Sequence, residues 1–89
     1  MPTYLVTYDL NKPGADYSDL LKKIKEFPWA RLSESSYAVN VNSTPEGLFN
    51  TLKPFLDQND NLYVITLKRP YTGFGPKQVN DWLEQHLPY

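Results

Sequence analysis

Strand-like and helix-like patterns follow one another along this chain in an order that leaves few folds open. Residues 3–9 are rich in Thr, Tyr and Val. Apolar side chains occur at both odd and even positions, and so on both faces, which is typical of a central strand covered on both sides. In residues 36–42, Tyr37, Val39 and Val41 alternate with smaller or polar residues, and this period of two predicts a strand with one buried face. Two shorter strands are predicted at residues 29–32 and 62–67.

Three helices are predicted between and after these strands. The first runs from a cap at Asp16 to Pro28, and the second begins at the capping residue Thr44, followed by Pro45, and ends near Pro54. The third occupies residues 77–87. Apolar side chains recur at the spacing that gathers them on one helix face. They are Tyr17, Leu20, Leu21, Ile24 and Phe27, then Leu48, Phe49, Leu52, Phe55 and Leu56, then Val79, Trp82, Leu83 and Leu87, with His86 on the same side of the third helix.

The order β-α-β-β-α-β predicts a ferredoxin-like α+β fold with a four-stranded antiparallel sheet and a C-terminal helix. Right-handed crossovers set the strand order as 4-1-3-2 and place the first two helices on one face of the sheet. We therefore expect residues 1–67 to form the core. Residues 68–89 are expected to form a loop and a helix packed on that core or on a partner subunit, with Trp82 and Leu83 packed rather than exposed.

Size and composition predict a homodimer. Eighty-nine residues suffice for one domain, and the absence of cysteine excludes disulfides, thiolate metal sites and cysteine nucleophiles. A core this small, without such staples, can gain stability by association. The sheet face opposite the helices also needs a cover.

Charge and hydropathy bear on partners and location. Nine Lys and Arg against ten Asp and Glu give a net charge of −1, which does not indicate general affinity for nucleic acid. No apolar run is long enough to span a membrane, and the first residues do not resemble a signal peptide. We expect a cytoplasmic protein without a membrane partner.

Asp9 is the candidate catalytic residue because it ends the first predicted strand, and ligands often gather at strand ends. Two Asp9 carboxylates near a dimer axis could share one Mg²⁺, which would activate water and bind a phosphate. No cofactor is otherwise required. The alternative is that Asp9 caps the turn at residues 10–14 through main-chain N–H groups.

A second candidate site is a basic and aromatic surface. Tyr71 and Phe74 lie between basic residues, and such a surface can bind single-stranded nucleic acid by stacking and phosphate neutralisation. The alternative is solvated charge around a loop whose aromatic side chains pack on the core. Residues 71–75 lack the pattern of a phosphate-binding loop, and His86 has no partner acid at a fixed spacing. The basic candidates are Lys12, Arg31, Lys68, Arg69 and Lys77.

Three segments resemble the Cas two family, the small second protein of the CRISPR adaptation machinery. They are YLVTYDL at residues 4–10, SSYAVNV at residues 35–41 and DNLYVITL at residues 60–67. The chain is more narrowly similar to a SinR-like offshoot of short bacterial and phage proteins. That similarity is carried by NKPGADY at residues 11–17, by Trp29 and by DWL at residues 81–83.

The resemblance implies a ferredoxin-like subunit that dimerises, in several members through the uncovered sheet face. Some members are metal-dependent nucleases that use the acid at the end of the first strand, here Asp9, and others act as DNA-bridging dimers. This chain departs from the family in two respects. Tyr17, Ser18 and Asp19 stand where basic residues are usual, and the third helix replaces a short fifth strand.

Two functions follow as hypotheses. The first is a dimeric protein with a nucleic-acid-related role, including Mg²⁺-dependent cleavage of RNA or DNA. The second is a non-catalytic dimeric module that binds another protein, such as an antitoxin-like or phage-encoded regulator. Whole-chain resemblance favours the first. The acidic balance, the single candidate acid and the aromatic tail favour the second.

Overall fold

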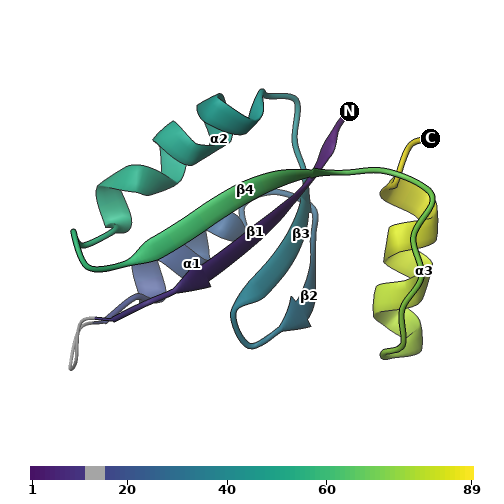
Figure 1. Ribbon diagram of the computed structural model, residues 1–89, viewed down its shortest axis with the longest axis horizontal. Coiled ribbons are helices and arrows are strands. Elements are labelled where there is room, and N and C mark those ends of the chain that lie inside the picture. The colour runs from purple at the N-terminus through teal and green to yellow at the C-terminus, as the bar shows by residue number, and fades with distance from the viewer. Residues whose placement is uncertain (12–15) are drawn as a thin grey trace.

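The computed structural model describes residues 1–11 and 16–89, so Lys12 and most of the turn predicted before the first helix lie outside the described residues. Figure 1 shows the elements in chain order. They are β1 (Thr3–Asp9), α1 (Ser18–Ile24), β2 (Trp29–Ser33), β3 (Ser36–Asn40), α2 (Pro45–Leu52), a 3₁₀ turn (Lys53–Phe55), β4 (Asn61–Leu67) and α3 (Lys77–His86).

Within the described residues the fold is α+β, with three α-helices and one four-stranded antiparallel sheet. The strands lie in the order β2-β3-β1-β4, so β1 and β3 are central and β2 and β4 are the edges. Leu5 of β1 is paired with Ala38 on one side and with Ile65 on the other. The two central strands are the ones that the sequence pattern predicts to be central.

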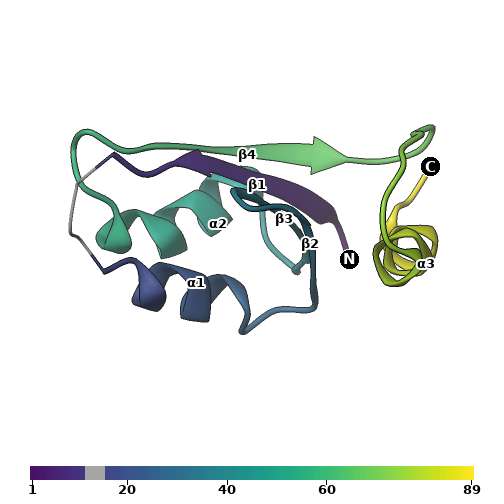
Figure 2. The same ribbon diagram turned by 90° about the horizontal axis from the view of Figure 1, so that it is seen from below.

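Helices α1 and α2 cover one face of the sheet (Figure 2). Side chains from both layers meet there in a single hydrophobic core, as the period-two and helical patterns predict. The sheet contributes Tyr4, Val6, Tyr37, Val39 and Leu62, and the helices contribute Leu20, Ile24, Leu48 and Leu52.

Helix α1 is shorter than predicted. Its cap position is Tyr17, which makes no side-chain cap bond; the predicted cap, Asp16, lies one residue earlier and accepts a hydrogen bond from the Ser18 N–H at 2.9 Å. The helix ends at Ile24. The Phe27 N–H then donates a hydrogen bond to the Ile24 carbonyl, three residues back, which makes a tighter turn than an α-helix. Proline disfavours helical geometry in the residue before it, so Pro28 excludes Phe27 from the helix. Phe27 nevertheless packs against the core.

Helix α2 begins and ends at the predicted signals. Thr44 caps it by accepting a hydrogen bond from the Gly47 N–H at 3.0 Å, and Pro45 is its first residue. The helix ends at Leu52, and the 3₁₀ turn that follows contains Pro54. Proline supplies no N–H and crowds the preceding turn, which explains this end.

Helix α3 lies beyond the end of the sheet where β4 finishes and β1 begins (Figure 1). The Arg69 N–H and side chain donate to the Pro88 and Leu87 carbonyls, and Leu87 is buried. Trp82 and Leu83, expected to be packed, are half-buried. Among the residues described, no helix is long and apolar enough to cross a membrane.

The face opposite α1 and α2, called the open face below, is only partly covered. Leu5, Thr7, Tyr63 and Ile65 belong to it, because paired residues of neighbouring strands point to the same side. Tyr63 and Ile65 keep 64% and 50% of their surface exposed. Apolar side chains therefore reach solvent on the β4 side of this face.

Candidate functional site

Asp9 lies at the rim of the open face. It is the last residue of β1 and is paired with Asn61, the first residue of β4. Since side chains two positions apart share a face, Asp9 is on the same side as Thr7 and Tyr63. These residues and Tyr8 line a shallow depression of about 180 Å³. The candidate acid is exposed, and it lies on the same face of the sheet as the exposed apolar side chains of β4.

Asp60, just before β4, connects the chain that leaves β1 to the turn that enters β4. The sequence did not single it out. Its carboxylate accepts hydrogen bonds from the Asn11 N–H and the Asp57 N–H, both at 2.8 Å. It also accepts one from the Tyr17 hydroxyl at 2.8 Å. In the described part of the turn, the Asn11 N–H therefore donates to Asp60 rather than to Asp9.

The rim offers oxygen ligands to a metal ion. Asp9 supplies a carboxylate and Asn61 an amide oxygen in the same depression, whereas the Thr7 hydroxyl is hydrogen-bonded to the Ser36 hydroxyl at 2.9 Å. Mg²⁺ accepts such a set when water and a substrate phosphate complete its coordination. Within residues 1–11 and 16–89, no three His, Asp or Glu side chains cluster as a metal site. A tightly held ion would need the carboxylate of a second copy.

Two basic candidates of the tail, Arg69 and Lys77, are engaged in local ion pairs. The Arg69 guanidinium contacts the Glu84 carboxylate at 3.0 Å, and the Lys77 ammonium contacts Asp81 at 2.7 Å. Hydrogen bonding to Glu84 raises the pKa of Arg69, and hydrogen bonding to Asp81 raises the pKa of Lys77. Both cations therefore have partners within the chain.

The other basic candidates are placed elsewhere. Arg31 lies on β2, where its Nε donates to the Ser33 carbonyl at 3.2 Å. Lys68 is exposed just after β4. Their role in binding nucleic acid stays a prediction.

The aromatic residues of the tail loop behave differently from one another. The Tyr71 hydroxyl donates to the Glu84 carboxylate at 2.7 Å, and this bond is the main cause of the lowered pKa of Glu84. Phe74 is fully exposed. The His86 ring is stacked on Trp82 with centroids 4.0 Å apart, and its Nδ1 lies 2.8 Å from the Trp82 carbonyl oxygen. His86 is thus engaged with its own helix.

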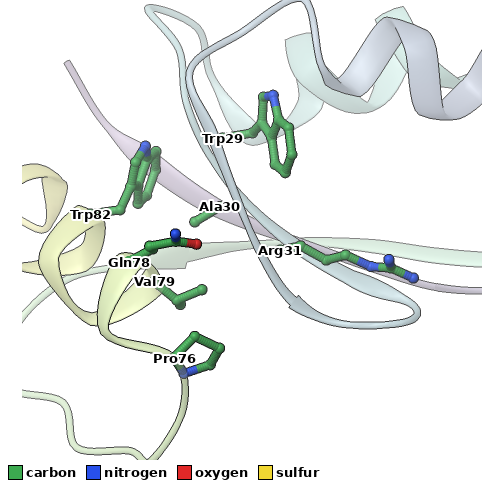
Figure 3. Close-up of a pocket in the computed structure, with 7 residues that line it drawn as sticks. All are labelled: Trp29, Ala30, Arg31, Pro76, Gln78, Val79 and Trp82. Carbon is green, nitrogen blue, oxygen red and sulfur yellow. The ribbon is translucent and has the colours of Figure 1, made fainter.

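A larger hollow, of about 470 Å³, lies between β2 and α3 (Figure 3). The sequence did not indicate it, because it exists only once α3 is placed beside the edge of the sheet. Its walls combine aromatic and aliphatic side chains with one cation and one amide. The lining residues are Trp29, Ala30 and Arg31 of β2, and Pro76, Gln78, Val79 and Trp82 at and in α3.

The fold and these two surfaces define a small α+β protein with a partly uncovered sheet and an acidic residue at its rim. No protein-family model matches the chain, and no solved structure matches it.

Proposed function

We propose that this protein is a Cas-two-like homodimer with a ferredoxin-like subunit and a nucleic-acid-related role in the cytoplasm of a bacterium or in phage infection. The subunit assignment is supported by the order β2-β3-β1-β4, which is 4-1-3-2 read from the other edge, and by two helices on one face. The observation that carries the proposal is the open face, with exposed Tyr63 and Ile65 in line with Asp9.

The dimer uses this face. A two-fold axis brings the same patch of both subunits together. A patch without charged side chains can therefore pack on its copy without electrostatic repulsion. Tyr63, Ile65 and Leu5 form such an uncharged patch across two strands. Stable interfaces bury about 1,200–2,000 Å² in total, so the dimer contact would extend from this patch to the flanking rim of the sheet. Covering this face also removes exposed apolar surface from water.

Asp9 is the residue on which nuclease chemistry would depend. With Asn61 and the Asp9 of the second copy, it would hold Mg²⁺ at the rim of the interface. The ion, when bound, supplies an activated water and neutralises a phosphate. Asp9 itself contributes the negative charge that holds the ion, and the neighbouring Tyr63 offers an aromatic surface beside it.

The second candidate is a non-catalytic dimeric interaction module. It is favoured by the donor set, since Asp9 is the one carboxylate among the described residues that line the rim depression. The ion pairs of Arg69 and Lys77 also leave less free positive charge for nucleic acid. On this reading the open face still forms the dimer, and Asp9 has no catalytic task.

The deciding experiment is cleavage of end-labelled single-stranded RNA and DNA with Mg²⁺ or Mn²⁺. A nuclease should cut only with the metal, and Asp9→Asn should abolish cutting, because a neutral amide cannot replace the carboxylate charge. Asp19→Asn, at an exposed position in α1, is the matched control and should cut like the wild type. We expect wild-type cleavage to be absent or very weak. Cleavage that survives Asp9→Asn comes from a contaminant and favours the non-catalytic module.

A further inference from the structure

The outer edge of β2 is open toward the hollow beside α3. In an antiparallel pair, main-chain groups point alternately toward the partner strand and away from it. The Asn40 N–H donates to the Pro28 carbonyl at 3.0 Å, so this pair is of the hydrogen-bonded type. Ala30, paired with Ala38, is the next residue of that type along β2. The N–H and C=O groups of Trp29 and Arg31 consequently point away from β3, to the side where the hollow lies.

The side chains around this edge suit an extended ligand. Ala30 projects toward α3, on the side from which Trp82 and Val79 reach across, whereas Arg31 extends away from α3 (Figure 3). Ala30 has a small side chain and lines the hollow, so an incoming side chain has room beside it. Trp82 is held in place by its stacking on His86. A strand added to β2 would therefore place alternate side chains in an apolar pocket on the α3 side.

The charge around the hollow is positive. Of the described residues that line it, Arg31 is the one that carries a charge. The Lys25 ammonium lies 5.0 Å from the centre of the Trp29 ring, on the same flank of β2 as Arg31. Side chains of an added strand that point to this flank would meet two cations. Acidic side chains fit there.

The length of the site is limited by an irregularity in β2. The register with β3 shifts between Arg31 and Ser33, and such a bulge ends regular pairing at a sheet edge. The regular edge runs from Pro28 to Arg31, which matches about three or four residues of an extended chain.

We propose that this hollow binds an extended peptide segment of a partner protein, which adds as a strand to the edge of β2. Its apolar side chains enter the pocket made by Ala30, Val79 and Trp82, and its acidic side chains lie beside Arg31 and Lys25. Main-chain hydrogen bonds to Trp29 and Arg31 supply affinity, and the alternating side chains supply specificity. This site goes beyond the proposed function and does not depend on Asp9, which lies at the opposite end of β1 from Thr3 and α3.

The test uses a fluorescein-labelled peptide of alternating aspartate and valine, titrated with the full chain and followed by fluorescence anisotropy. Saturable binding is expected. The same peptide with every second backbone nitrogen methylated cannot complete the ladder, so its affinity should fall by at least about tenfold. Equal binding of the methylated peptide, or no saturable binding of either, would overturn the proposal.

Charge reversal provides the second arm. Arg31→Glu should weaken the aspartate peptide about tenfold and strengthen a lysine–valine peptide. Lys53→Glu, an equal charge change at an exposed site in the 3₁₀ turn after α2, should do neither. Asp9→Asn should leave peptide binding unchanged, which separates this site from the proposed function. Displacement of the peptide by an oligonucleotide, with a loss of oligonucleotide binding in Arg31→Glu, would assign the hollow to nucleic acid and overturn the proposal.

Discussion

The Thr3 hydroxyl, in the first strand, donates a hydrogen bond of 2.7 Å to the main-chain carbonyl of His86, at the end of the last helix. The same hydroxyl accepts one from the Asn40 side chain at 3.0 Å, and Thr3 is fully buried. One small polar group therefore fastens α3 to the two central strands.

Thr3→Val keeps the shape of this side chain and removes both bonds. We expect a loss of about 1–3 kcal/mol in the free energy of unfolding, because the partly buried His86 carbonyl loses its bond to Thr3. The Asn40 amide keeps the Met1 and Pro2 carbonyls as acceptors. Urea denaturation measures the loss, and hydrogen exchange should show α3 opening first. Thr66→Val, at an exposed position of β4, is the control and should change stability little. Unchanged exchange in α3 would show that the helix is held by other contacts.

Asp60→Ala should be among the most destabilising changes outside the core. It removes the acceptor for the Tyr17 hydroxyl and for the N–H groups of Asn11 and Asp57, and we expect a cost of about 1–3 kcal/mol. Asn59→Ala, an exposed neighbour, is the comparison in the same denaturation experiment and should lie within about 0.5 kcal/mol of the wild type. Equal stability of the two variants would contradict the role given to Asp60.

The wild-type protein should sediment as a dimer at tens of micromolar, and Ile65→Lys should shift it to the monomer. The reason is that a two-fold interface would bring the new charge into an apolar patch twice. Thr66→Lys places the same charge on the opposite side of β4 and should remain dimeric. A monomer mass for the wild type would remove the dimer from the proposed function.

Trp82→Ala should lower stability by about 1–3 kcal/mol, less than the 3–5 kcal/mol typical of a fully buried aromatic residue, because Trp82 is half-buried and stacked on His86. Phe74→Ala, which removes a fully exposed ring, should have almost no effect on the melting temperature. Equal melting temperatures for the Trp82 variant and the wild type would show that the tail does not contribute to stability.

Acid should loosen the tail before it unfolds the core. Hydrogen bonds from Tyr71 and Arg69 hold the pKa of Glu84 below its ordinary value of 4.5. A carboxyl whose pKa is lowered by folding contributes stability above its unfolded pKa and loses it as the pH falls through the folded pKa. Tryptophan fluorescence should therefore change below about pH 4.5, and Glu84→Gln should remove that change. A transition that persists in Glu84→Gln would belong to another group.

Local patterns were sufficient for most of the elements. The bounds of β1 agree with the prediction, and the cap at Thr44 and the end of α2 before Pro54 follow from chemistry that acts over a few residues. The end of α1 was predicted too late, because the apolar spacing continues to Phe27 while Pro28 already excludes helical geometry there.

The site depends more on contacts between distant residues. Asp60 was missed because its partners Tyr17 and Asn11 precede it by 43 and 49 residues. The pairing of Arg69 with Glu84 also depends on how the tail folds back, whereas Lys77 and Asp81 stand four apart on a helix and could have been paired from sequence. The position of α3 beside β2 cannot be derived from its apolar stripe, which predicts only that it packs somewhere.

The central position of β1 has a consequence for biosynthesis. This strand is synthesised before its two neighbours, β3 and β4, which follow later in the chain. Until residues 61–67 have left the ribosome, β1 lacks its β4 neighbour. One edge of a strand with apolar side chains on both faces then has unpaired main-chain N–H and C=O groups. Incomplete chains should therefore be the form of this protein that is most prone to aggregate and most dependent on chaperones.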